Sequence, residues 1–111
     1  VRSGQKIETR KHIVITGDVN PGSEIISGGD IIVLGKLSGK VHAGSPDNHD
    51  AIIFALDFKP TQVSIGEVVA AGIEEDVPAK PEFACVEGSG IIVKDYMKAN
   101  PFRKMPWPEA V

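Results

Sequence analysis

The stretch IVITGDV, residues 13–19, returns as IIVLGKL at 31–37 and again as IIFALDF at 52–58. The three copies align position by position, except that Leu56 stands where the first two have glycine. They start 18 and 21 residues apart (31 − 13 and 52 − 31). A unit this short cannot bury its own apolar face, so the copies must stack on one another to make a core. Because each copy holds one strand and no helix, the pattern predicts an all-β fold, a β-helix solenoid whose coils hydrogen-bond as parallel strands.

Turn signals between the copies complete the predicted coil. Copy one runs into Asn20–Ser23 (NPGS), a strong turn because proline fixes φ and the glycine after it accepts positive φ. A second short strand follows at Ile25-Ile26, and residues 27–30 turn into copy two. Each coil is therefore a strand, a corner, a short strand and another corner. Before copy one, the weak alternation of Lys6–Thr9 predicts a solvent-facing edge strand.

Composition limits the chain to a small set of protein classes. Its 111 residues fit one compact domain, and 41% hydrophobic with 24% charged residues is ordinary for a globular protein. A formal net charge of −3 disfavours nucleic-acid binding. The single cysteine, Cys85, excludes an internal disulfide and fits a reducing compartment. No signal peptide opens the sequence, no apolar run is long enough to span a membrane, and Val1 in place of Met indicates an excised fragment.

Both faces of the predicted strands are apolar. Side chains two apart share a face, so if Val19, Leu37 and Phe58 point inward, the first and third residues of each copy do too. The outward apolar residues that we expect to form a dimer face are Val14, Ile32, Leu34, Ile53 and Ala55. Such a face needs a cover, and a second copy of the chain can provide one through a two-fold interface. The alternative is that the C-terminal segment folds back over it.

The remainder of the chain is predicted to close the solenoid. Residues 67–84 read as an irregular connection, with the acidic run 74–76 as a solvated loop. Residues 83–86 and 91–93 flank a glycine-bearing turn and predict a hairpin that closes the last coil. We therefore expect a β-helix domain over 1–93 and a C-terminal tail, 94–111, that either caps the open end or stays mobile.

No catalytic pattern stands out. Neither Gly35-Lys36 nor Gly39-Lys40 is followed by Ser or Thr, so the phosphate-loop motif fails. The polar loop around His49 is explained by turn chemistry without a metal. Asp18 and Asp57 occupy equivalent positions with Lys36 between them, which favours a charge ladder over a general acid and base. The sequence does not read as an enzyme, and no cofactor or metal ion is expected.

Several short motifs occur together in the order of a known family. They are RSGQ at 2–5, GDVNPGSE at 17–24, GDI at 29–31, GK at 39–40, AG at 43–44, IFA at 53–55 and VSI at 63–65. Over residues 1–93 the chain resembles the C-terminal domain of the septum site-determining protein MinC. The tail from Lys94 is outside the resemblance.

The resemblance implies a right-handed, three-sided parallel β-helix that forms a homodimer through one face. It implies binding to the membrane-associated ATPase MinD and a cytoplasmic protein that this partner recruits to the inner face of the cell membrane. It also implies a role in division inhibition, namely blocking assembly of the FtsZ ring, the septum precursor, at wrong sites. In this family much of that inhibitory activity belongs to an N-terminal domain that lies outside this sequence.

The resemblance also assigns partner-binding residues. From chemistry alone, residues 2–5 could be an ordinary exposed turn, whereas in the family this motif binds MinD, which implicates Arg2, Ser3, Gly4 and Gln5. A second basic contact falls on Lys40, which keeps a charge where the family has arginine, while Ser38 loses the neighbouring one. Two other readings stay open: a self-polymerising β-helix scaffold and, with less support, a β-helical acyltransferase or lyase.

Overall fold

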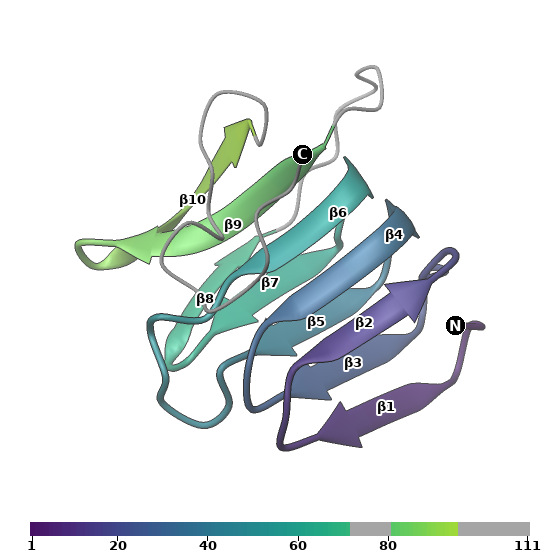
Figure 1. Ribbon diagram of the computed structural model, residues 1–111, viewed down its shortest axis with the longest axis horizontal. Helices are drawn as coiled ribbons and strands as arrows, with labels where there is room; N and C mark the ends of the chain where they lie inside the picture. Colours follow the sequence, from purple (N-terminus) through teal and green to yellow (C-terminus); the bar gives the residue numbers. More distant parts are fainter. Residues whose placement is uncertain (72–80, 96–111) are drawn as a thin grey trace, which may run out of the picture.

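The computed structural model describes residues 1–71 and 81–95, and every regular element within them is a β-strand. Sheet A contains, in spatial order, β1 (Lys6–Thr9), β3 (Glu24–Ser27), β5 (Lys40–Ala43), β7 (Gln62–Ile65) and β8 (Val68–Ala71). Sheet B contains β2 (Ile13–Thr16), β4 (Ile31–Leu37), β6 (Ile53–Phe58), β9 (Glu82–Glu87) and β10 (Gly90–Asp95). From β1 to β7 the chain alternates between the two sheets (Figure 1).

Parallel pairing between successive coils confirms the predicted β-helix. In sheet A, β1, β3, β5 and β7 pair in parallel, and in sheet B, β2, β4 and β6 do the same. The first strand, β1, ends sheet A and its burial alternates between exposed and half-buried, as expected for an edge strand. The solenoid is therefore built by repetition of one coil.

A third, short side joins the two sheets. Val19 bridges Leu37 in parallel, and Leu37 pairs with Phe58. Val1 extends the same ladder, because its carbonyl accepts the N–H of Asn20 at 2.9 Å and its amino group donates to the carbonyl of Asp18 at 2.7 Å. Val19, Leu37 and Phe58 are almost fully buried. The coil therefore has three sides, as the family resemblance implies.

The third copy is shifted by one residue from its predicted alignment. Ile53 pairs with Ile31 and Ala55 with Val33, whereas Phe58 still pairs with Leu37. Ile53 and Ala55 have no exposed surface, so their assignment to the outward dimer face is wrong.

The cause of the shift is a bulge in the second copy. Between the paired residues, β4 has two residues, Leu34 and Gly35, where β6 has only Leu56. One residue fewer reverses the face of every side chain before it. Phe54, which pairs with Ile32, therefore lies on the outward side instead of the predicted inward one.

The Asp18 side chain provides a hydrogen-bond acceptor for the backbone at this bulge. Its Oδ1 accepts the N–H of Lys36 at 2.8 Å. A Cβ on Gly35 would lie 2.4 Å from the carbonyl oxygen of Gly17 and 2.7 Å from Asp18 Oδ1, so only glycine fits there. Asp57, the other acidic member of the predicted charge ladder, lies 3.4 Å from the amino group of Lys59.

Inward side chains from all three sides meet in one core. Its largest fully buried members are Ile25, Ile31, Leu37, Ile53 and Ile65. A second, smaller cluster of Ile52, Phe54 and Phe83 is also buried, with Ile32 and Cys85 packed against it. Apolar residues therefore pack on both faces of sheet B.

After the third coil the chain reverses direction. The turn at Gly66-Glu67 leads into β8, which pairs antiparallel with β7, so the expectation of a wholly irregular connection over 67–84 is wrong for this part. The predicted hairpin is confirmed, because β9 and β10 pair antiparallel and β9 lies antiparallel along β6. Lys94 bonds to Glu87 within the hairpin, and this hydrogen bond raises the pKa of the Lys94 amino group. Lys94 and Asp95, the first two residues of the predicted tail 94–111, belong to β10, so the boundary predicted after Val93 is wrong by these two residues. The acidic run 74–76 and the rest of that tail lie outside the described residues.

Replacing Gly35 by alanine tests the bulge. We expect Gly35→Ala to lower the free energy of unfolding by about 1–3 kcal/mol, because backbone atoms would have to move to admit the methyl group. Urea denaturation followed by circular dichroism measures this. The control is Gly90→Ala, where a Cβ meets nothing within 4 Å, and the change should stay within about 0.5 kcal/mol. Equal stability of the two variants would contradict the bulge geometry.

Candidate partner-binding site

The Arg2 loop, defined as residues 2–5, is a tight β-turn. The N–H of Gln5 donates to the carbonyl of Arg2 at 3.0 Å, which closes the turn. Gly4 occupies its third position with φ of +85°, the value that a type II turn requires and that glycine accepts without strain. All four residues are exposed. The loop therefore presents its side chains to solvent from a defined backbone.

A second turn of the same kind supports the Arg2 loop. In Asn20–Ser23 the N–H of Ser23 donates to the carbonyl of Asn20 at 3.2 Å, and Gly22 has φ of +84°. The N–H of Gly4 donates to the carbonyl of Gly22 at 3.0 Å, so the two turns stack. Sequence reasoning found both turns but did not place the second under the first.

The side chain of Gln5 is used inside the loop. Its Oε1 accepts the backbone N–H of Arg2 at 2.6 Å. Its backbone carbonyl accepts the N–H of Glu24 at 2.9 Å, at the start of β3. Among the side-chain groups of the loop, those of Arg2 and Ser3 and the amide nitrogen of Gln5 remain for contacts outside it.

Lys40 lies on the same edge of the solenoid as the Arg2 loop. Its N–H donates to the carbonyl of Ser23 at 3.0 Å, and its side chain is exposed at the start of β5. Lys6, Glu24 and Lys40 pair across β1, β3 and β5. At ordinary strand spacing, the first and third members lie about 10 Å apart. We call the row formed by the Arg2 loop, Lys6, Glu24 and Lys40 the Arg2 edge. Ser38, in the same corner as Lys40, is buried.

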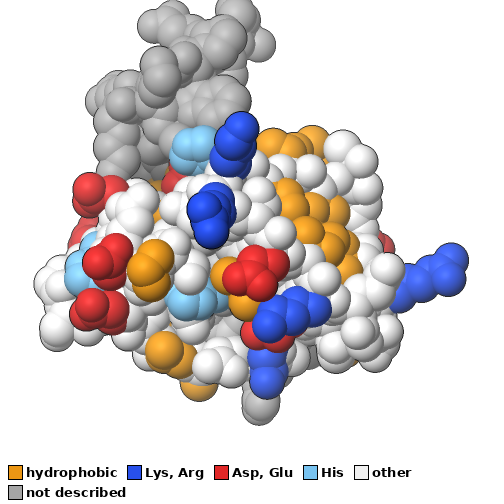
Figure 2. All heavy atoms as spheres, turned by 90° about the horizontal axis from the view of Figure 1, so that it is seen from below, with side chains coloured by type: hydrophobic (Ala, Val, Ile, Leu, Met, Phe, Trp, Pro, Cys, Tyr) orange, Lys and Arg blue, Asp and Glu red, His pale blue; other side chains and the backbone are white. Residues whose placement is uncertain are grey.

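Charge around the Arg2 edge is mixed in sign. Glu24 stands between Lys6 and Lys40 in the ladder, and the third side adds Asp18 and Lys36. The view in Figure 2 shows acidic and basic side chains interspersed over one face, with a continuous group of hydrophobic side chains beside them. The described residues of this edge thus carry both signs of charge, and a partner that bound there would have to match individual charges.

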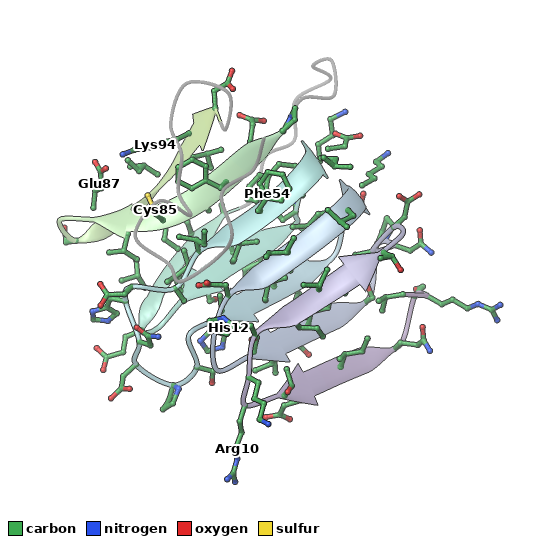
Figure 3. All side chains as sticks on the ribbon, in the orientation of Figure 1. Arg10, His12, Phe54, Cys85, Glu87 and Lys94 are labelled. Atoms are coloured by element: carbon green, nitrogen blue, oxygen red, sulfur yellow. The ribbon has the colours of Figure 1, made fainter. Side chains whose placement is uncertain are left out.

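The outer face of sheet B is the other candidate interface. Val14, Leu34 and Leu56 keep 52%, 44% and 43% of their surface exposed, an unusual density for large apolar side chains on neighbouring strands. Ile32, in register with Val14, lies between them and is half-buried. Phe54 of β6 and Cys85 of β9 lie further along the sheet (Figure 3). Leu56 was not among the residues predicted for the outward face, because the alignment of the three copies set it opposite a glycine.

The opposite corner of the coil holds a structural polar cluster. The N–H of Asp30 donates to Nδ1 of His12 at 2.9 Å, and the Asp30 carboxylate accepts the N–H of Ile52 at 2.8 Å. Arg10 projects into solvent at this end of β1, away from the Arg2 loop (Figure 3). In the described ranges no three His, Cys, Asp or Glu side chains gather as metal ligands. The same ranges contain no helix with the length and hydropathy of a membrane span.

Comparison with known proteins gives consistent matches. The model of the family "Septum formation inhibitor MinC, C-terminal domain" matches residues 1–96. A probable septum site-determining protein MinC from Clostridium acetobutylicum is 50% identical over 97 residues, covering 86% of this chain and 46% of the relative. The corresponding protein of Aquifex aeolicus is 41% identical over 107 residues, covering 95% of this chain and 53% of the relative.

A solved structure agrees with these matches. The MinC:MinD cell division protein complex of Aquifex aeolicus contains a chain that superposes with a TM-score of 0.81 at 43% identity, covering 86% of this chain and 80% of that one. The chain spans about half the length of the curated relatives it matches. The family model covers most of the sequence, and the stacked coils have the corresponding fold; the chain belongs to the MinC family, as its C-terminal domain.

Proposed function

We propose that this chain is a non-enzymatic adaptor domain that binds a MinD ATPase through the Arg2 edge. The observation that carries the proposal is the exposed Arg2 loop, held by backbone hydrogen bonds on the same edge as Lys40. It is supported by the similar fold of a chain in the MinC:MinD complex.

The chemistry of the edge fits a protein partner with acidic groups. An arginine guanidinium offers five N–H donors in a planar fork and binds a carboxylate or two carbonyls. Lys40 adds a point charge two strands away from Lys6, the residue that follows the loop, so two separated acidic groups on the partner would be needed. Ser3 supplies a neutral hydrogen bond. Gly4 leaves open space beside the turn, which allows the partner backbone to approach.

We further propose that the outer face of sheet B forms a homodimer. Its exposed members are Val14, Leu34 and Leu56, with Ile32 and Phe54 between them. A two-fold interface requires only that this one patch be self-complementary. The dimer would present two Arg2 edges, and two simultaneous contacts bind far more tightly than one.

In the cell, the proposed role is that of a cytoplasmic division inhibitor. The partner ATPase would recruit the dimer to the inner face of the membrane. There it would help to block FtsZ ring assembly at wrong sites, mainly through the part of the relatives that lies outside this sequence. The membrane contact would be indirect and would follow the nucleotide state of the partner.

A scaffold that polymerises end to end is the second candidate. It is favoured by β1 and β2, which end the two sheets and leave their outer ladder edges unpaired among the described residues. Negative-stain micrographs of the pure chain test it. Under the adaptor proposal no filaments form, and filaments of one solenoid's width would support the scaffold instead.

The Arg2 contact is tested by co-sedimentation with MinD and lipid vesicles, in ATP and in ADP. The chain should pellet with MinD only in ATP. Arg2→Ala should weaken that binding at least about tenfold, because it removes an arginine that the partner would bury in the complex. Arg10→Ala is the matched control, since Arg10 is also exposed but lies at the far end of β1. If Arg2→Ala pellets like the unchanged chain, the site is wrong. If the unchanged folded chain never pellets, the proposed partner is wrong.

The dimer face is tested by analytical ultracentrifugation at micromolar concentration. The chain should sediment as a dimer and Leu34→Asp as a folded monomer, because burying an unpaired carboxylate at the interface is strongly unfavourable. Val69→Asp is the control, since Val69 is 59% exposed but lies on sheet A. A monomeric unchanged chain, or a dimeric Leu34→Asp, would contradict this interface.

A further inference from the structure

Gln5 is exposed, yet it makes two hydrogen bonds within its own loop and one to the start of β3. Its backbone N–H donates to the carbonyl of Arg2 at 3.0 Å, and its side-chain Oε1 accepts the N–H of Arg2 at 2.6 Å. Its own carbonyl accepts the N–H of Glu24 at 2.9 Å. One glutamine thus binds both polar groups of the Arg2 backbone and is itself tied to β3.

These bonds fix the point from which the Arg2 side chain leaves the loop. On the other side of Arg2, the carbonyl of Val1 accepts the N–H of Asn20 at 2.9 Å. The Arg2 backbone is therefore held on both sides, although the residue itself is exposed. Ordering such a loop only at the moment of binding would cost affinity, and a loop ordered in advance avoids that cost.

We propose that Gln5 is a positioning residue for the partner site: it holds the Arg2 backbone in the binding conformation through Oε1. It does not use its side-chain amide to contact the partner. This inference rests on the proposed function of the Arg2 edge. It differs from the expectation that all four loop residues supply contacts.

Two substitutions separate positioning from direct contact. Gln5→Glu keeps an oxygen that can accept the Arg2 N–H but removes the amide donor. Gln5→Met keeps the size of the side chain and removes the acceptor. A positioning role predicts loss of affinity in the methionine variant and retention in the glutamate variant, whereas a contact through the amide predicts loss in both.

The first measurement needs no partner. Hydrogen exchange of the Arg2 amide, followed by NMR on the free chain, should be slow in the unchanged protein and in Gln5→Glu. In Gln5→Met it should be about fivefold faster or more, because one hydrogen bond to this amide is lost. Equal exchange in all three proteins would overturn the proposal.

The second measurement is MinD binding in ATP by co-sedimentation, at about 0.15 M and 0.5 M salt. Gln5→Met should bind roughly tenfold more weakly at both salts, since the loop must be ordered on binding. Gln5→Glu should bind within about threefold of the unchanged chain at the higher salt, where the added charge is screened. If Gln5→Glu binds as weakly as Gln5→Met while its Arg2 amide stays protected, the Gln5 amide contacts the partner directly and the proposal is wrong.

The two measurements also separate this inference from the proposed function. If the unchanged chain does not bind MinD, the proposed function fails and the positioning role fails with it. The exchange of the Arg2 amide would still show whether Gln5 holds the loop. Protection together with wild-type binding by Gln5→Met would reject the positioning role alone.

Discussion

In-register hydrogen bonding between parallel coils is the constraint on which the whole structure depends. Each strand of β1 to β7 has polar backbone groups that only a neighbouring strand can satisfy, and up to the third coil that neighbour belongs to the adjacent coil. Corners can therefore change length only if the strands on both sides keep their register. The bulge at Leu34-Gly35 shows how a change is absorbed: β4 gains a residue, Asp18 Oδ1 binds the N–H of Lys36, and the third side continues through Leu37 and Phe58.

Much of this arrangement could be predicted from the sequence, because three similar stretches imply stacking and glycine-containing corners imply turns. Copies one and two were placed on the correct faces, since their spacing contains no irregularity. Copy three was not, because Ile52 and Ile53 are equally suited to a strand and both faces of sheet B are apolar. The alignment of Leu56 with a glycine was the one sign in the sequence that the third copy has one residue fewer than the second between its paired positions. Strand β8 was missed because its Val and Ala side chains show no alternation of apolar and polar residues.

The candidate site divides in the same way. The turn at residues 2–5 follows from Gly4, and the partner-binding role proposed for it comes from family resemblance. The location of residues 2–5 on the same edge as Lys40 follows only from the stacking of coils. The internal bond to Gln5 Oε1 could not be predicted, because it depends on a side-chain conformation that the motif does not specify. Residues that look alike in a motif can thus have different physical tasks.

The position of β1 at the end of sheet A has a consequence for local stability. A terminal strand bonds to one neighbour only, so its coil opens at a lower free energy than the coils inside the stack. The Arg2 loop belongs to this outermost coil, whereas Lys40 belongs to an inner one. A ligand that touches both would hold three layers together and suppress fraying of the first. Recognition at this edge would thereby be coupled to the order of the solenoid's end, and part of the binding free energy would be measured as protection of β1 from exchange with solvent.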